Sequence, residues 1–464
     1  MSNTAQQRGK DLFFTERMLA SESYATISRV IVRVLALGIS FFILSSLSPY
    51  EYGAYQLLIV TYAFFSAFVG WGGGVIGNDI FRFFGEGDDA RAKKLFHELA
   101  LYRFISGVLI WAGVFFGASL LSFRFGEEFI GIMRLLSFLF LHDIFFDLCK
   151  LLVRARLFFR AIAVRSNVNK LAQLIALAVF YFTAHIGIRE VVLSEIIGAF
   201  VGLATMVPLA LKAYAPWRSI ASAKERFMMF GIFRSYGKWN LFRPLINNTS
   251  DLVQPWIIKV LLSTEVLGLF VVAKSIIGMV KDFFPVKSFV TLIPLVGSDA
   301  VRQQRIFTYG TKYMFLLSLV LAGGALIVFP PVIRIFFEQY TPALPFFYIL
   351  LFNVPIIAFG SLLGSYLVYL RKQKFLFVKS ALNETFIFVF YLVCIPLIGI
   401  WALPLERIVT PLVILPLIYF YLRRYKISIQ FEWKKLFSFG EEDKVFLRTI
   451  ISLSSGFLRK VVRV

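Results

Sequence analysis

The sequence predicts an all-α integral membrane protein whose chain crosses the bilayer about twelve times, in two parallel repeats of six helices. First, 59% of its 464 residues are hydrophobic and only 16% are charged, whereas about a quarter of residues are charged in soluble domains. Second, the mean hydropathy is +0.77, and stretches long enough to cross a hydrocarbon core of roughly 30 Å recur along the chain. Third, one short phrase occurs in both halves.

The expected membrane spans follow the apolar stretches in chain order. The first begins after the charged leader of residues 1–23, and it is too long for the core of a signal peptide, so we expect it to stay in the chain. Each later span has about 20 residues or more, the length that a membrane helix requires. The twelve ranges are 24–47, 55–80, 98–121, 129–152, 164–184, 190–211, 238–262, 267–293, 308–330, 344–370, 377–398 and 401–422.

Basic residues gather in alternate connections between these spans. The positive-inside rule places such connections in the cytoplasm, so both chain termini are expected there. The basic connections hold Arg82, Arg91, Lys93 and Lys94; Arg154, Arg156, Arg160 and Arg165; Lys212, Arg218, Lys224, Arg226 and Arg234; Arg302 and Arg305; and Arg371, Lys372 and Lys374. The intervening short loops hold only Arg124, Arg189 and Arg334.

The formal net charge of +22 therefore reports mainly this topology and contact with anionic membrane lipids. Nucleic acid is not an expected partner, because the basic residues are spread over many short loops. In the tail, residues 426–464, apolar residues at helical spacing alternate with arginines and lysines, which predicts an amphipathic helix on the inner membrane surface. Cys149 and Cys394 both fall inside expected spans, so no disulfide framework is expected.

The phrase that occurs twice is LSPYEYGAY at residues 47–55 and LSTEVLGLF at residues 262–270. Both copies have Leu-Ser, four residues, a glycine, one residue and an aromatic, and 268 minus 53 gives an offset of 215 residues. Each copy joins the first two helices of its half on the outer side, so the match favours a parallel repeat, as in transporters whose substrate binds between the halves. A chance match is the alternative. The predicted segments are an N-lobe at 24–212, a linker at 213–237 and a C-lobe at 238–425.

Three parts of the sequence support a family resemblance: LSSLSPYEYGAYQLLIV with the later FRFFGEGDDARAKKLF, then LLVRARLFFRAIAVRSNVNKLAQLIAL, then LINNTSDLVQPWIIKVLLSTEVLGLFVVAKSI. They resemble the bacterial polysaccharide-transport (Wzx-type) flippases of the multidrug/oligosaccharidyl-lipid/polysaccharide (MOP) exporter superfamily. The resemblance implies the MOP fold and movement of a lipid-linked glycan from the inner to the outer leaflet of the bacterial inner membrane. It also implies that the first, second, seventh and eighth spans flank a central cleft.

The span 238–262 carries the clearest polar pattern within the predicted membrane. Arg243, Asn247, Asp251 and Gln254 are spaced four, four and three residues apart, so they share one helix face. Four aligned polar groups favour a stripe that lines a cavity. In the alternative, Arg243 reaches the cytoplasmic surface and its neighbours only dock another helix.

Further basic residues lie in spans that flank the cleft in the resembling family. Arg29 and Arg33 are four residues apart in the first span, and Lys274 and Lys281 are seven apart in the eighth. Together with Arg243 they predict a cationic cleft for a polyprenyl pyrophosphate, because arginine forks and lysine point charges match its anionic oxygens. Snorkelling to the surface or local pairing is the alternative for each residue taken singly.

Four acids within the spans are candidates for coupling transport to H⁺ or Na⁺: Asp143, Asp147, Asp251 and Glu384. For Asp147, a pair with Lys150 on the next turn is an equal alternative. The glycines Gly72, Gly73 and Gly74 match part of a dinucleotide-binding pattern, but no strand precedes them. They predict instead a hinge or a point of close packing in the second span.

No enzymatic function is expected. The three histidines are scattered, no cysteine pair has ligand spacing and no nucleophile motif occurs, so neither metal ligands, catalytic residues nor a cofactor are predicted. The prediction is therefore a flippase for cell-surface polysaccharide or O-antigen precursors, working beside other membrane proteins of polysaccharide assembly. The alternatives are a cation-coupled multidrug exporter, whose cleft should be rich in acids, and a membrane glycan ligase or polymerase, which should have a sizeable outer loop.

Overall fold

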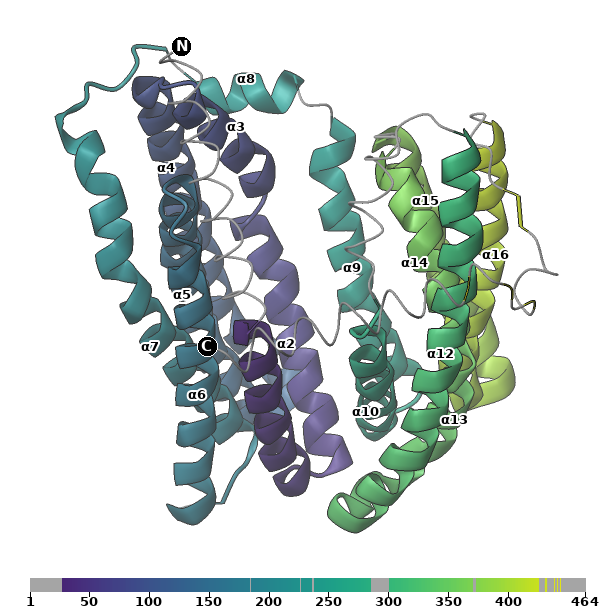
Figure 1. Cartoon of the computed structure of the whole chain (residues 1–464). Coiled ribbons are helices and arrows are strands. Elements are labelled where there is room, and N and C mark those ends of the chain that lie inside the picture. Colours follow the sequence, from purple (N-terminus) through teal and green to yellow (C-terminus); the bar gives the residue numbers. More distant parts are fainter. Residues whose placement is uncertain are drawn as a thin grey trace, which may run out of the picture. The chain divides into compact units, whose positions relative to one another are not determined.

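The computed structural model describes residues 27–183, 185–225, 227–235, 238–284, 300–369 and 373–424, with Gln430, Phe431, Ser438, Gly440 and Asp443. The regular structure of these residues is entirely helical, which confirms the predicted fold class (Figure 1). Seven helices of this part are by themselves long and apolar enough to cross a membrane, and one bent pair makes eight. The predicted segment 1–23 and nearly all of the predicted amphipathic tail lie outside the described residues.

Each of the twelve predicted spans contains a helix in its described residues, and two of them are divided. In the span 267–293 the helix ends at Lys281, and residues 285–293 lie outside the described part of the chain. The span 55–80 is broken into α2 and α3, and 344–370 into α13 and α14. The helices are Ile27–Ser46, α2 Pro49–Val69, α3 Gly73–Gly85, α4 Asp89–Gly117, α5 Ser122–Ala155, α6 Phe159–Thr183, α7 Ile188–Tyr214, α8 Met228–Ser235, α9 Lys238–Leu261, α10 Thr264–Lys281, α12 Ala300–Phe336, α13 Leu344–Leu351, α14 Asn353–Tyr369, α15 Gln373–Ile398 and α16 Ala402–Arg424. Short 3-10 turns include η2 Ala215–Ser219 and η3 Glu338–Ala343.

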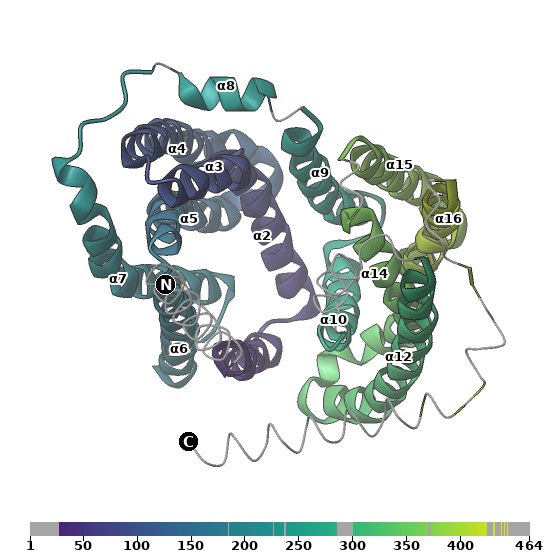
Figure 2. The same ribbon diagram turned by 45° about the horizontal axis from the view of Figure 1, so that its top comes forward.

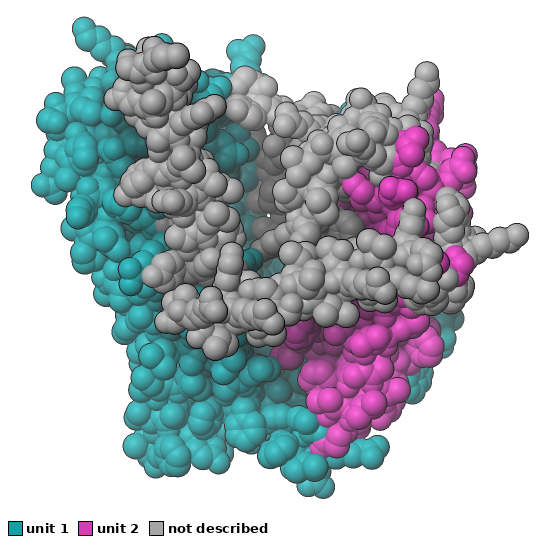
Figure 3. All heavy atoms as spheres, viewed as in Figure 1, with its two compact units in different colours: residues 1–272, 332–343, 373–403 teal, residues 273–331, 344–372, 404–464 magenta. Residues whose placement is uncertain are grey.

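The chain forms two compact units, which Figure 3 colours separately. Unit 1 comprises Met1–Val272, Val332–Ala343 and Gln373–Leu403, and unit 2 comprises Ala273–Pro331, Leu344–Lys372 and Pro404–Val464. Helices α9 and α15 thus belong to the same unit as the first six spans. The units do not follow the predicted lobes, whose boundaries remain a prediction.

Unit 1 is a bundle in which α3, α4 and α5 pack together and α6 and α7 pack on the α5 side (Figure 2). One hydrophobic cluster, which includes Ile76, Leu95, Met206 and Trp217, lies at the end that carries the α3–α4 turn and residues 215–235. We call this the linker end. Glycines let helices α6 and α7 approach closely, since a Cβ at Gly198 would lie 2.7 Å from a backbone oxygen of α6.

Helix α2 begins with a complete set of start signals. The Ser48 hydroxyl accepts the backbone N–H of Glu51 at 3.3 Å, the Glu51 carboxylate accepts the N–H of Ser48 at 2.8 Å, and Pro49 occupies the first turn. Tyr340 of η3 is fully buried here and donates its hydroxyl to the Leu47 carbonyl at 2.9 Å. In the second copy of the repeated phrase, Ser263 accepts the N–H of Val266 at 3.1 Å and starts α10 in the same way.

The two copies of the repeated phrase meet each other inside unit 1. A Cβ on Gly53 would lie 2.0 Å from the carbonyl oxygen of Thr264, and a Cβ on Gly268 would lie 2.0 Å from that of Pro49. In each case the carbonyl belongs to the residue four before the other glycine, so the contact is reciprocal. Helices α2 and α10 therefore cross backbone to backbone at the one position of the phrase where both copies have glycine.

In unit 2, the segment after α16 is attached to α12 through a buried lysine. Lys312 donates to the carbonyl of Ser438 at 2.6 Å and to the carboxylate of Asp443 at 2.7 Å. The Tyr313 hydroxyl donates to the same carboxylate at 2.6 Å. The donors from Lys312, Tyr313 and the Gly440 backbone lower the pKa of Asp443 to about 2.

Candidate functional site

The glycine-rich segment of the second span is a true break in the helix. Helix α2 ends at Val69, Gly72 has φ of +70°, and α3 begins at Gly73. A left-handed φ is accessible to glycine without strain, which explains why the chain can break here. Gly72 and Gly73 thus lie at the break and exposed Gly74 lies just inside α3. That the break works as a hinge remains a prediction.

Two groups from other helices pack against this break. A Cβ on Gly73 would overlap the guanidinium of Arg103, which is buried in α4 and forms an ion pair with Asp147 of α5 at 2.8 Å. On another side, the Phe233 ring of α8 stacks on Trp71 at 5.4 Å. The expected pair of Asp147 with Lys150 is replaced by the pair with Arg103, because packing brings α4 closer to this carboxylate than the next turn of its own helix.

Asp143 lies one turn before Asp147 and has a separate set of partners. It accepts hydroxyl hydrogen bonds from Tyr62 at 2.6 Å and Ser66 at 2.5 Å, both on α2. His142 Nδ1 lies 3.2 Å from its other oxygen. Nη2 of Arg165 in α6 lies 3.2 Å from Nε2 of the same histidine, and its guanidinium also lies over the Phe146 ring. We call Tyr62, Ser66, His142, Asp143 and Arg165 the Asp143 cluster.

Sequence reasoning misses most of this arrangement. It places Arg165 in a basic connection, whereas this residue lies in α6, which begins six residues earlier at Phe159. It does not single out Arg103, although a position inside an apolar span is a signal. Two further polar contacts in unit 1 are not predicted from the sequence. Tyr55 donates its hydroxyl to Glu195 of α7 at 3.3 Å, and Lys170 of α6 donates to Gln173 at 2.8 Å.

The residues of the predicted cationic cleft are distributed over both units. Arg29 and Arg33 are exposed on the first helix of unit 1, and Lys274 and Lys281 are exposed on the part of α10 that belongs to unit 2. Arg243 and Asn247 lie in α9, but their side chains are outside the described part of the structure. The cationic cleft therefore stays a prediction.

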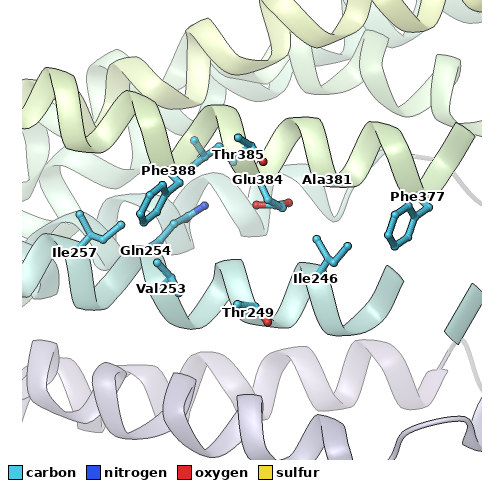
Figure 4. A pocket seen from close by; sticks show the side chains of 11 residues that line it. Ile246, Thr249, Val253, Gln254, Ile257, Phe377, Ala381, Glu384, Thr385 and Phe388 are labelled. Atoms are coloured by element: carbon cyan, nitrogen blue, oxygen red, sulfur yellow. The ribbon is translucent and has the colours of Figure 1, made fainter. Parts of the chain in front are cut away.

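A cavity of about 560 Å³ lies between α9 and α15 of unit 1. Its lining is mostly apolar, and Figure 4 shows Gln254 and Glu384 in the space between the two helices. Gln254 is buried, and Glu384 accepts a hydrogen bond from Asn383 at 3.1 Å. Asp251 is exposed and is not part of this lining. Of the two residues of the predicted polar stripe whose side chains are described, the cavity is lined by Gln254, and Glu384 joins it from α15.

The predicted linker is docked on the linker end of unit 1. The Trp217 indole is buried and donates to Asp89 at 2.8 Å, and Lys93 donates to the carbonyl of Ile220 at 2.6 Å. Arg91 pairs with Glu225 at 2.8 Å. Each of these bonds joins residues 215–225 to the first turns of α4, so this part of the linker is fastened to unit 1.

Among the described residues, no group of three or more His, Cys, Asp or Glu side chains is placed to hold a metal ion. Two acids of unit 1 instead face donors from neighbouring helices: Asp147 pairs with Arg103 of α4, and Asp143 accepts the hydroxyls of Tyr62 and Ser66 of α2. Such an arrangement offers a metal ion few free lone pairs.

Comparison with known proteins places this geometry in a family and a fold. The model of a family described as polysaccharide biosynthesis protein matches residues 46–291, which is 246 of 464 residues and covers both copies of the repeated phrase. No curated protein matches the sequence.

Several solved structures have a similar fold. An inward-facing multidrug resistance transporter of the MATE family, in the MOP superfamily, has a TM-score of 0.71 at 13% identity over 88% of this chain and 98% of that one. For the MATE multidrug transporter DinF-BH the TM-score is 0.61 and the sequence identity 16%, and the match covers 89% of this chain and 96% of that one. For the lipid II flippase MurJ, in an inward closed conformation, the TM-score is 0.61 and the sequence identity 13%, and the match covers 94% of this chain and 99% of that one. At these identities the likeness shows the fold, which is that of the MOP exporters.

Proposed function

Because the chain belongs to this family of polysaccharide biosynthesis proteins, we propose that it is a flippase for a lipid-linked oligosaccharide. In this proposal the glycan is carried on an undecaprenyl pyrophosphate-type lipid, and alternating access moves it from the inner to the outer leaflet. The product serves cell-surface polysaccharide or O-antigen synthesis. The protein lies in a bacterial inner membrane with both termini in the cytoplasm, where its basic connections meet anionic lipids.

The observation that carries the proposal is the family match combined with an exporter fold. A multi-pass transporter from a polysaccharide biosynthesis family has an evident task, because glycans assembled on a lipid at one membrane face must reach the other. The break between α2 and α3 supports alternating access, since it provides a point at which the second span can bend.

The proposed substrate site is the cationic cleft. Arg29 and Arg33 of the first helix, with Arg243, Lys274 and Lys281, would bind the pyrophosphate, and Asn247 and Gln254 would meet the sugar hydroxyls. The lipid chain would remain in the bilayer during transport. In support, the side chains of Arg29, Arg33, Lys274 and Lys281 are all exposed, on helices that coincide with predicted membrane spans.

We propose further that transport is coupled to an ion. Asp143 and Asp147 line the interior of unit 1 next to the break of α2, and Asp251 and Glu384 are the candidates on α9 and α15. H⁺ and Na⁺ are both compatible with carboxylates. Other membrane proteins of polysaccharide assembly would consume the exported product.

A leaflet-exchange assay tests this function. Purified protein in proteoliposomes is given a fluorescent polyprenyl pyrophosphate-linked oligosaccharide, and its protection from an external quencher is followed in time. Exchange that requires the protein and is weakened by Arg33→Gln, but not by Arg189→Gln in a predicted outer loop, supports the proposal. Efflux of organic cations without glycan exchange would favour a multidrug exporter, and lengthening of the glycan would favour a ligase or polymerase.

A further inference from the structure

Helix α8 differs from the spanning helices of unit 1 in its direction. It lies across α4 and α9, on the outer side of α4 (Figure 1 and Figure 2). Its second residue, Met229, donates its backbone N–H to the Glu98 carboxylate of α4 at 2.9 Å. Glu98 is 98 minus 89, or nine, residues along α4 from Asp89, which is about 14 Å at 1.5 Å per residue. It is also the first residue of the predicted span 98–121, so α8 lies at the level where the apolar part of α4 begins.

This helix has apolar residues on two opposite faces. The inner face packs on the hydrophobic cluster of the linker end and consists of Met228, Met229, Ile232 and Phe233. The outer face is exposed, and Phe227, the residue just before the helix, joins Phe230, Gly231 and Arg234 on it at spacings of three, one and three. The Phe227 side chain is 78% exposed and that of Phe230 is 67% exposed. A helix that faced only water on this side would have polar residues there, so the outer face indicates contact with the bilayer.

The backbone at Phe227 supports the same interpretation. Its φ is +56°, and its carbonyl accepts the N–H groups of Phe230 and Gly231 at 3.1 and 3.2 Å, so Phe227 starts the helix. A left-handed backbone favours glycine or asparagine, and a helix start favours serine, aspartate or asparagine. In the described part of the chain, the other non-glycine residue with positive φ is Leu157, at +59°, in the α5–α6 turn of the same end. Its side chain is 50% exposed. Insertion into a bilayer surface explains why both strained positions have large apolar side chains.

Exposed basic residues accompany the two phenylalanines. Arg218 and Lys224 precede α8, and Arg234 lies in its last turn. The acid of this stretch, Glu225, is paired with Arg91 at 2.8 Å. Aromatic rings that enter the acyl boundary beside cations that meet phosphates match a bilayer with anionic headgroups. We propose that the outer face of α8 docks on the bilayer and binds anionic phospholipid, and that this contact holds the break of the second span. The inference does not depend on which substrate is transported.

The ring of Phe233 connects this contact to the break. It lies on the inner face of α8, stacks on Trp71 at 5.4 Å, and lies 2.5 Å from where a Cβ of Gly72 would be. One side chain of α8 thus covers both the last residue before the left-handed glycine and the glycine itself. Because of this contact, α8 cannot leave unit 1 without uncovering the break, and a bilayer that holds α8 in place also restricts the bend.

Quenching by brominated lipid tests the docking surface. Cys149 and Cys394 are replaced by alanine, and a fluorophore is attached to Gly231→Cys on the outer face, where nothing lies within 4 Å of a Cβ. Gly85→Cys at the end of α3 and Gly113→Cys within α4 are controls with equally open surroundings. The protein is placed in nanodiscs that contain the same fraction of brominated lipid, either as phosphatidylglycerol or as phosphatidylcholine.

The three positions should differ. The Gly231 probe should be quenched more strongly by brominated phosphatidylglycerol than by brominated phosphatidylcholine, the Gly113 probe equally by both, and the Gly85 probe by neither. A Gly231 probe that behaves like the Gly85 probe would overturn the docking, and equal quenching by the two lipids would overturn the anionic preference. Disulfide-linked dimers of unlabelled Gly231→Cys, formed in place of quenching, would show that a second copy of the chain occupies this face.

A variant that keeps the helix tests the link to the break. Phe227→Asn with Phe230→Gln removes the apolar face, while asparagine suits the left-handed helix start and glutamine suits the helix. In phosphatidylglycerol nanodiscs this variant should lose the quenching at Gly231 and speed amide hydrogen exchange of residues 70–76. Phe182→Gln removes an 82% exposed ring from the opposite end of α6 and should change neither. Loss of quenching with unchanged exchange of residues 70–76 would overturn the link to the break. Because no lipid-linked glycan is used, a negative leaflet-exchange assay would contradict the proposed function and leave this result standing.

Discussion

The reciprocal glycine contact between α2 and α10 gives a quantitative prediction for Gly53→Ala. The new methyl carbon would lie 2.0 Å from the Thr264 oxygen, whereas ordinary contact begins at 3.4 Å, so the two backbones must separate by 3.4 minus 2.0, or 1.4 Å. Overpacking of this kind costs about 1–3 kcal/mol. Gly113→Ala in α4 is the matched control, because nothing lies within 4 Å of its Cβ and it gains the same helix propensity. Gly53→Ala should therefore be about 1–3 kcal/mol less stable than Gly113→Ala.

Thermal unfolding of the purified variants in one detergent measures this difference. The double variant Gly53→Ala with Gly268→Ala tests whether the two positions share one contact, because a separation of the helices that admits one methyl group also admits the other. Its loss should be close to that of either single variant, which corresponds to a coupling of about 1–3 kcal/mol between the two positions. Strictly additive losses, or equal stability of Gly53→Ala and Gly113→Ala, would refute the reciprocal crossing.

Three further predictions concern other contacts. Arg103→Leu leaves Asp147 without its partner and should lower the free energy of unfolding by roughly 3 kcal/mol. This is the low end of the range for a buried pair, because Asp147 is 28% exposed. In thermal unfolding, the double variant Arg103→Leu with Asp147→Leu should recover most of the lost stability. Trp217→Ala removes a buried indole ring and should lower the free energy of unfolding by about 3–5 kcal/mol. Limited proteolysis should then cut residues 215–225 faster in this variant than in the control Trp401→Ala, because the Trp401 side chain is 42% exposed. The lowered pKa of Asp443 means that its ionised form stabilises the fold above about pH 4, and this contribution is lost as the pH falls through about 2. The difference in unfolding temperature between wild type and Asp443→Asn should accordingly vanish across that range.

The helices could be predicted from the sequence because the length of an apolar stretch is a local property. Each of the twelve spans contains a helix in the part of the chain that the structure describes, and the resemblance to polysaccharide-transport flippases is confirmed by the family match and the fold. The break at Gly72 could also be predicted locally, since glycine adopts a left-handed conformation without strain and a run of glycines is a local sequence feature.

The interior contacts could not be predicted in the same way, because they depend on which helices become neighbours. Asp147 has a lysine at helical spacing on its own helix, yet Arg103 from α4 is its partner. Arg165 lies close to a helix start, so the sequence attributes its charge to topology rather than to a contact with His142. The hydroxyls of Tyr62 and Ser66 carry no signal, because tyrosine and serine are ordinary in a membrane helix until a carboxylate faces them.

The crossing of Gly53 with Gly268 also bears on the origin of the chain. A residue that touches its own counterpart, with the same neighbouring carbonyl on both sides, has the geometry of a two-fold homodimer interface. In a homodimeric ancestor, one codon would have specified both glycines, and any larger residue would have entered the interface twice. After duplication and fusion, each glycine is inherited separately, yet neither can be enlarged without displacing the backbone of the other repeat. The contact thus gives a physical reason why both copies of the phrase have glycine at this position.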